Sequence, residues 1–226
     1  EKMTKKLIDP NAQRDLIRVL GKSGSRSSLR ILAEKGRGAQ KWLALLELEK
    51  LSEHRPLAEL HQALIDAPAE EKEYIVEIII RRAHSDSIPV LRRLLIDSKD
   101  SRLRQKTLQL MADMLNQDYE TLMLDILKSY STVAESHFHS SHSPHHDAAS
   151  QPRLETNDKN ELRAQIALSL GKARSKKAIP LLIALLGDHD PMVQKAARVA
   201  LELTQDPEAQ EYIKEHHQRR GEGHVH

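Results

Sequence analysis

Apolar residues recur along this chain at intervals of three and four, the spacing that places them on one face of an α helix. Segment 191–203 is a clear case, because its apolar stripe consists of Val193, Ala196, Ala197, Ala200 and Leu201. Gly, Pro and small polar residues separate such segments and mark where one helix ends and the next begins. The pattern predicts helices at 11–20, 26–35, 38–52, 56–66, 69–83, 86–97, 101–115, 118–131, 159–170, 176–186, 191–203 and 207–218.

Two stretches of the chain follow one template. Residues 20–32 align without a gap with residues 170–182, and in both a helix ends near a Gly, a short basic loop follows, and a new helix begins. A third copy of the helix start lies at 86–91. Recurrence at a spacing of roughly 30 residues is typical of stacked helical hairpins. We therefore expect an all-α protein, a right-handed α-solenoid of about five or six hairpins that forms a single domain over residues 1–226.

The clearest unit joins two helices through a short acidic turn. Its parts are Ala178–Leu186, Asp188–Pro191 and Val193–Leu201, and Asp190 is placed to cap the second helix with Pro191 in its first position. These residues resemble the HEAT repeat family, in particular the short bacterial variety called phycobilisome-lyase-like HEAT repeats. The resemblance implies a stacked scaffold, and it also implies an alternative function as a subunit of a phycobilisome-type bilin lyase. Segment 29–83 departs from the pattern, since its first helix lacks the Pro and its first turn lacks the Asp.

The composition agrees with packed helices and argues against several functions. Aromatic residues make up only 3% of the chain, whereas strands are rich in them. The formal net charge of +2 is too balanced for a general nucleic-acid-binding protein, which disfavours nucleic acid as the partner. The chain has no Cys, which excludes disulfides and thiolate chemistry, and no nucleophile elbow, phosphate-binding loop or zinc-hydrolase motif is found. The sequence therefore favours a non-catalytic role and predicts no cofactor.

One segment breaks the helical period. Residues 132–157 are rich in Ser, His and Pro, which predicts a disordered loop inserted into one hairpin, and residues 219–226 are expected to form a frayed tail. Imidazoles are common ligands of zinc, nickel and copper, so metal binding is a further alternative function. The candidate ligands are His137, His139, His142, His145 and His146. A Ser-rich loop supplies no fixed coordination geometry, so the competing interpretation is a loop without a specific ion.

Charge is distributed unevenly along the middle of the chain. Acidic residues outnumber basic ones from Glu47 to Glu77, and basic residues outnumber acidic ones from Arg81 to Lys106. If the second helices of the hairpins line a concave face, Arg102 and Lys106 project together from one of them, because they are four residues apart. We therefore expect a protein–protein interaction scaffold or adaptor that holds an acidic protein on this face. The candidate contacts are Arg81, Arg82, Arg92, Arg102, Arg104, Lys106, Glu70, Glu73 and Glu77. The alternative interpretation is solvated helix faces with ion pairs inside each helix.

No segment has the length and apolar character of a membrane span. The longest apolar run, Ile75–Ile80, is interrupted by Glu77 and is far shorter than the roughly 20 residues that a transmembrane helix needs. The N-terminal residues contain no hydrophobic region of a secretory signal. We therefore expect a cytoplasmic protein or, since the first residue is Glu1, the cytosolic part of a longer protein.

Overall fold

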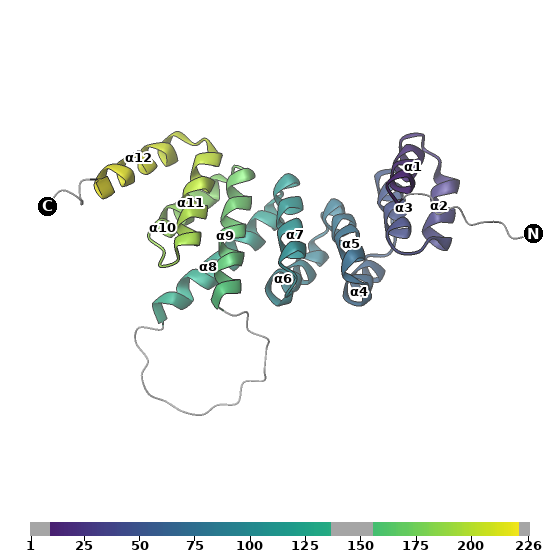
Figure 1. Cartoon of the computed structure of the whole chain (residues 1–226), viewed down its shortest axis with the longest axis horizontal. Coiled ribbons are helices and arrows are strands. Elements are labelled where there is room, and N and C mark those ends of the chain that lie inside the picture. Colours follow the sequence, from purple (N-terminus) through teal and green to yellow (C-terminus); the bar gives the residue numbers. More distant parts are fainter. Residues whose placement is uncertain (1–9, 137–155, 222–226) are drawn as a thin grey trace, which may run out of the picture. The chain divides into compact units, whose positions relative to one another are not determined.

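The computed structural model describes residues 10–136 and 156–221 (Figure 1). These residues form twelve α helices and two short 3-10 turns, and no strand occurs among them. The chain divides into two compact units, which we call unit 1 (residues up to Ser87) and unit 2 (residues from Ile88), and each is described by itself.

Unit 1 is built from two hairpins and one preceding helix. Its helices are α1 (Pro10–Lys22), α2 (Arg26–Lys35), α3 (Ala39–Lys50), α4 (Leu57–Asp66) and α5 (Ala69–Arg82), followed by a 3-10 turn at Ser85–Ser87. The pairs α2–α3 and α4–α5 pack as hairpins, and the second helices α3 and α5 also contact each other. Helix α1 packs against α2 and α3, which gives it the place of a second helix whose own first helix is absent from the described residues.

Unit 2 repeats the arrangement three times. Its helices are α6 (Ile88–Asp97), α7 (Ser101–Asp113), α8 (Gln117–Ser136), α9 (Thr156–Lys172), α10 (Ile179–Leu185), α11 (Pro191–Thr204) and α12 (Pro207–Gly221), with a 3-10 turn at Lys176–Ala178. The hairpins are α6–α7, α8–α9 and α10–α11. The second helices form a row, because α9 contacts both α7 and α11, and α12 packs against the last hairpin (Figure 1).

The all-α solenoid expected from the sequence is confirmed, and every predicted helix lies on an observed one. Three boundaries differ from the prediction. Helix α8 continues to Ser136 and α9 begins at Thr156, so the ends of the predicted loop at 132–157 are helical, and α12 extends into the predicted tail as far as Gly221. The reason is that lengthening an existing helix costs much less free energy than starting one. A single domain spanning both units stays a prediction.

Several second helices in both units end in the same way. A residue with left-handed backbone follows α1, α5, α9 and α11, namely Gly24 (φ 71°), Ala83 (φ 49°), Arg174 (φ 53°) and Gln205 (φ 56°). Such a residue lets the chain turn back sharply after the last helical carbonyl groups. Only the first is a Gly, so the other three turns hold a side chain in a conformation that costs roughly 1–2 kcal/mol. Counting back from this residue gives a common register for the four helices.

The cap predicted for α11 is confirmed. The carboxylate of Asp190 accepts hydrogen bonds from the backbone N–H groups of Met192 (2.8 Å) and Val193 (3.3 Å), with Pro191 in the first turn of α11. Asp100 caps α7 in the same way by accepting from Leu103 N–H at 3.0 Å. Each cap satisfies N–H groups that have no partner inside the helix.

The closest approach between second helices joins α9 to α11. A Cβ atom added to Gly171 would lie 2.5 Å from the Cα atom of Ala200 and 2.7 Å from its Cβ, far inside van der Waals contact. Gly on one helix and Ala on the other therefore allow the two backbones to touch. The predicted buried stripe of α11 is confirmed, because all five of its residues lie in the core.

This contact generates a stability prediction. Replacement of Gly171 by Ala should lower the free energy of unfolding by about 1–3 kcal/mol, because the added methyl group meets backbone atoms that cannot rotate away. Gly187→Ala is the matched control, since its nearest neighbour would be a carbonyl oxygen at an ordinary 3.6 Å. Chemical denaturation of the two variants measures the difference, and equal stabilities would contradict the close approach.

Candidate functional site

The second helices carry a stripe of exposed or half-buried residues, which we call the open face. On α5 the open face consists of Glu70, Glu73, Glu77 and Arg81, spaced at three and four residues. On α7 it consists of Arg102, Lys106, Gln109 and Asp113. Six of the nine predicted contact residues therefore lie on open faces, four in unit 1 and two in unit 2. Their role in binding stays a prediction.

Opposite charges on the open face of α5 pair with each other. Arg81 donates two hydrogen bonds to one carboxylate oxygen of Glu77, from Nε at 3.0 Å and from Nη2 at 2.8 Å. The two residues are four apart, the spacing at which side chains on a helix meet. At this end of α5 the charges therefore largely cancel, as the alternative interpretation of the sequence expects.

Arg82 lies inside the fold of unit 1 instead of on the open face. Its guanidinium donates to both carboxylate oxygens of Glu49, one at 3.0 Å, and to the carbonyl oxygen of Arg55. The other neighbour of Glu49 is His54, whose Nδ1 lies 2.6 Å from Oε2. Because both charges of the Arg82–Glu49 pair are largely buried, the pair holds α5 to α3 and to the following loop.

Arg92 belongs to a different row of helices. It lies on α6, a first helix, close enough to Tyr130 of α8 to influence its titration. Burial raises the pKa of the Tyr130 hydroxyl, Asp97 adds to the rise, and the positive charge of Arg92 opposes it. Arg92 therefore lies on a first helix and not on the open face of α7 with Arg102 and Lys106.

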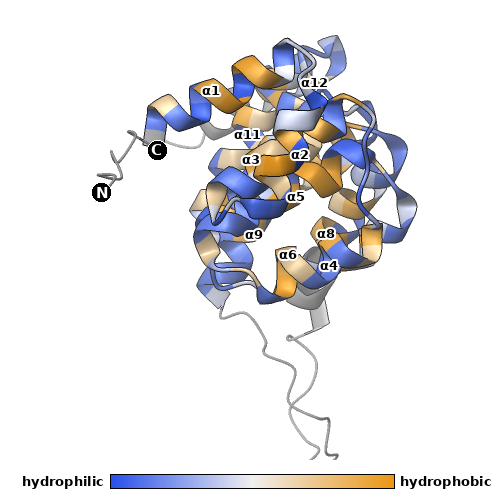
Figure 2. Cartoon of the chain, turned by 90° about the vertical axis from the view of Figure 1, so that its right-hand side faces the viewer, coloured by the Kyte–Doolittle hydropathy of each residue, from blue (hydrophilic) through white to orange (hydrophobic). Residues whose placement is uncertain are grey.

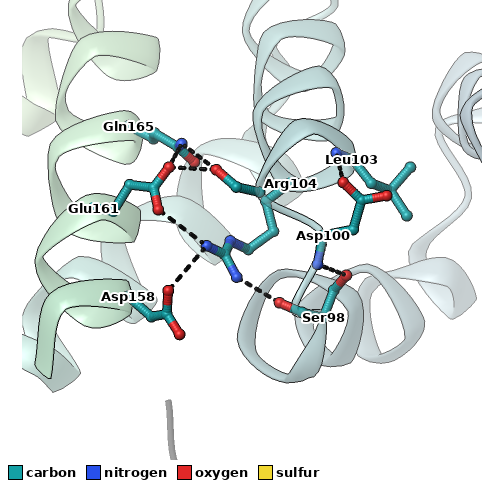
Figure 3. A network of polar contacts seen from close by, with 8 residues as sticks. Ser98, Asp100, Leu103, Arg104, Asp158, Glu161 and Gln165 are labelled. Atoms are coloured by element: carbon teal, nitrogen blue, oxygen red, sulfur yellow. Dashed lines mark hydrogen bonds and ion pairs between the residues drawn. The ribbon is translucent and has the colours of Figure 1, made fainter. Parts of the chain in front are cut away.

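Arg104 is the clearest correction to the sequence-based site, because it is completely buried. Its guanidinium donates to Ser98 C=O and lies 3.4 Å from Glu161 Oε2 and 3.9 Å from Asp158 Oδ1, as Figure 3 shows. Its Nε atom has no hydrogen-bond partner within the described residues. A buried cation is stable only where hydrogen-bond acceptors and carboxylates surround it. These partners of Arg104 therefore hold α7 against the first turns of α9.

An equivalent residue one hairpin later has the same role. Arg163 of α9 follows a Leu just as Arg104 does, is also buried, and donates to the carboxylate of Asp188 in the turn between α10 and α11. For Arg104 the corresponding turn would lie between α8 and α9, where the described residues are interrupted. Arg104 instead pairs with carboxylates on α9 itself. Both buried arginines therefore have an acidic partner, which lies in a turn for Arg163 and on a helix for Arg104.

The open face of α11 differs from those of α5 and α7 because it is largely apolar. Its residues are Met192, Lys195, Val199 and Leu203, and Met192 is 52% and Leu203 37% exposed. The open face of the neighbouring α9 consists of Glu161, Gln165, Leu168 and Lys172. In the common register Leu168 corresponds to Val199. We call Leu168, Met192, Val199 and Leu203 the apolar strip; the sequence analysis missed it, although its α11 members recur at intervals of seven and four outside the buried stripe.

A pocket of about 380 Å³ opens in unit 1 near the start of the loop after α3. Arg30 donates to both carboxylate oxygens of Glu53 at its rim, each at 2.8 Å. This hydrogen bonding holds the pKa of Glu53 below its ordinary value. The lining residues are Arg30, Ala33, Glu34, Leu45, Leu48, Glu53, His54 and Arg55. No Ser, Thr, Lys or Cys is among these lining residues.

The five predicted metal ligands, His137 to His146, lie outside the described residues. Within 10–136 and 156–221, no three His, Cys, Asp or Glu residues are grouped so that they could hold an ion. None of the helices in those ranges combines the length and the apolar character that a membrane crossing requires.

The buried position of Arg104 leads to a prediction. Arg104→Ala should lower the free energy of unfolding by about 3 kcal/mol, because the carboxylates of Asp158 and Glu161 lose their cation and a cavity remains. Arg102→Ala, two positions away on the exposed side of α7, should change it by no more than about 0.5 kcal/mol. Denaturant titration compares them, and a small effect at Arg104 would show that its guanidinium does not hold α7 to α9.

Comparison with known proteins agrees with the helical stack. Residues 151–221, which include α9 to α12, match the model of the family described as HEAT repeats. No curated protein matches the chain. The matched segment contains the α10–α11 hairpin, with its capped acidic turn and the close contact between α9 and α11. Over residues 151–221 the chain is therefore similar to HEAT repeats.

Proposed function

We propose that this protein is a non-catalytic protein-binding scaffold, and that its binding surface is the open face of α7, α9 and α11 in unit 2. The observation that carries the proposal is the apolar strip on α9 and α11, in which Met192 and Leu203 are exposed and Leu168 and Val199 are half-buried. Helix α11 already buries a complete stripe against its neighbours, so Met192 and Leu203 are not needed for the fold. Exposed apolar side chains gathered on one surface are a feature of protein interaction sites.

The charges around the strip favour an acidic partner. The open faces of α7, α9 and α11 carry the cations Arg102, Lys106, Lys172 and Lys195 and the carboxylates Asp113 and Glu161. Glu161 already accepts hydrogen bonds from Ser101 and Gln165 and faces Arg104. A partner segment with its own apolar side chains and flanking Asp or Glu residues therefore complements this surface.

The fold supplies rigidity to this surface. Its side chains project from helices held together by the Gly171–Ala200 contact and by the two buried arginines. A surface fixed in advance loses little conformational entropy on binding, so more of the contact free energy contributes to affinity. Catalysis is not required for any of these features.

The test compares two variants of the full chain as baits in a lysate of the source organism. The double variant Met192→Glu and Leu203→Glu should lose at least about 90% of the protein captured by the wild type, because it places two carboxylates in the strip. Ile65→Glu is the matched control, since Ile65 is an equally exposed apolar residue in unit 1 and should leave capture unchanged.

Two further readings complete this experiment. Capture by the wild type should fall as salt concentration rises, because the lysines and arginines around the strip contribute through screened charges. Circular dichroism should show equal helix content in all three baits. The same proteins captured in equal amount by the double variant would contradict the proposed surface.

A further inference from the structure

The N-terminal end of unit 1 exposes a helix face that is buried everywhere else in the repeat. Leu16 of α1 is 54% exposed and Val19 is 58% exposed. With the left-handed residue after each helix as reference, Leu16 corresponds to Ile75, Ile166 and Ala197, and Val19 corresponds to Ile78, Ser169 and Ala200. All six counterparts are buried, and Ile75 and Ile78 are 0% exposed. Leu16 and Val19 therefore occupy positions that are buried in the other three helices, but no described residue buries them in α1.

The missing contacts are those with another helix. Helices α5, α9 and α11 each pack against their hairpin partner and against the preceding second helix, and Ala200 of this face lies against Gly171 of α9. The exposed stripe on α1 runs along Ala12, Leu16, Val19 and Ser23, at intervals of four and three, and its small ends allow close approach of a helix. Figure 2 shows apolar stretches of α1 and of its neighbour α2 on the side of the chain that faces the viewer.

The charges beside this stripe are self-complementary. Asp15 and Lys22 are both exposed and flank the stripe on the same side, one near its start and one near its end. If a second α1 packs antiparallel on the first, Asp15 of each copy meets Lys22 of the other, whereas a parallel two-fold arrangement would place the charged flanks of the two copies on opposite sides of the contact and form no such pair. A two-fold axis across the stripe produces the antiparallel arrangement, which is also how the two helices of a hairpin pack.

The ion pair between Arg18 and Asp15 within α1 is weak enough to be replaced by this contact. Arg18 Nη1 lies 3.9 Å from Asp15 Oδ1, at the outer limit of an ion pair, and both side chains are largely exposed. Such a pair contributes little free energy, so Asp15 can exchange Arg18 for a lysine of a second copy at small cost.

A head-to-tail contact is less favourable than a two-fold one. In the common register, Val76 and Ile80 of α5 are buried, but the corresponding residues of α11 are Arg198 and Glu202. The last second helix thus has charged residues at positions that are apolar in α5, and terminal repeats of such proteins commonly carry a polar outer face that water can solvate. The apolar stripe of α1 finds no matching apolar face there.

We infer that the face of α1 formed by Ala12, Leu16, Val19 and Ser23 is the contact surface of a two-fold symmetric dimer, in which α1 of a second copy packs antiparallel against it. The dimer involves unit 1 and is independent of the partner surface proposed on unit 2. It covers Leu16 and Val19 in the way that hairpin partners cover their counterparts in α5, α9 and α11.

Sedimentation of the full chain over a concentration series tests the inference. The wild type should reach twice the mass of one chain as concentration rises. The double variant Leu16→Gln and Val19→Gln should stay at the mass of one chain, with unchanged helix content and thermal unfolding because both side chains are exposed. The control Ile65→Gln removes an equally exposed apolar residue elsewhere in unit 1 and should dimerise as the wild type does.

A charge exchange tests the two-fold geometry separately. Asp15→Lys should weaken dimerisation by roughly fivefold, since it places two lysines together at each end of the pair. Adding Lys22→Asp to the same chain should restore it, because the unlike pair reforms with its signs exchanged. The inference is overturned if the wild type stays monomeric at all concentrations or if the glutamine variant dimerises normally. A doubly exchanged chain that dimerises no better than Asp15→Lys overturns it as well.

Discussion

The structure depends on one constraint, which is that no helix of this chain can cover its own apolar stripe. Within each unit, a second helix lies against a first helix and against a neighbouring second helix. The contact between Gly171 and Ala200 illustrates this constraint, because their small side chains let the backbones of α9 and α11 approach closely. Burial of apolar area in these contacts supplies the main favourable free energy of folding.

The same constraint explains the buried polar side chains. Stacking helices closely also buries the places where turns and helix ends meet, and these places need hydrogen bonds. Asp100 and Asp190 satisfy helix starts, while Arg104 and Arg163 connect one second helix to the next hairpin. A buried arginine costs free energy unless it is surrounded by acceptors, so these residues fix how successive hairpins align. The side chains that take no part in these buried contacts form the outer surface, which includes the proposed binding surface.

Helix positions were predictable from the sequence because the apolar periodicity is strong and because Asp190 and Pro191 mark a helix start. The candidate site was less predictable, since a charged residue in a helix looks the same in sequence whether it is exposed or buried. Arg104 and Arg82 were assigned to a surface for this reason, although the repeated Leu–Arg pairs at 103–104 and 162–163 were an available signal for the first. The left-handed turns at Ala83 and Gln205 carry no such signal, because neither residue type favours that conformation. Met192 and Leu203 were missed because exposure of an apolar residue depends on which neighbours are present.

Side chains at equivalent positions of the repeat are buried by a neighbouring helix wherever one is present. We propose that the apolar side chains without such a neighbour form contact surfaces. Carbene footprinting of the dilute full chain, read residue by residue, measures this most directly. The account predicts strong labelling of Leu16, Val19, Met192 and Leu203 and almost none of Ile75, Ile78 and Ile166. Comparable labelling at Leu16 and Ile75, or at Val19 and Ile78, would contradict it.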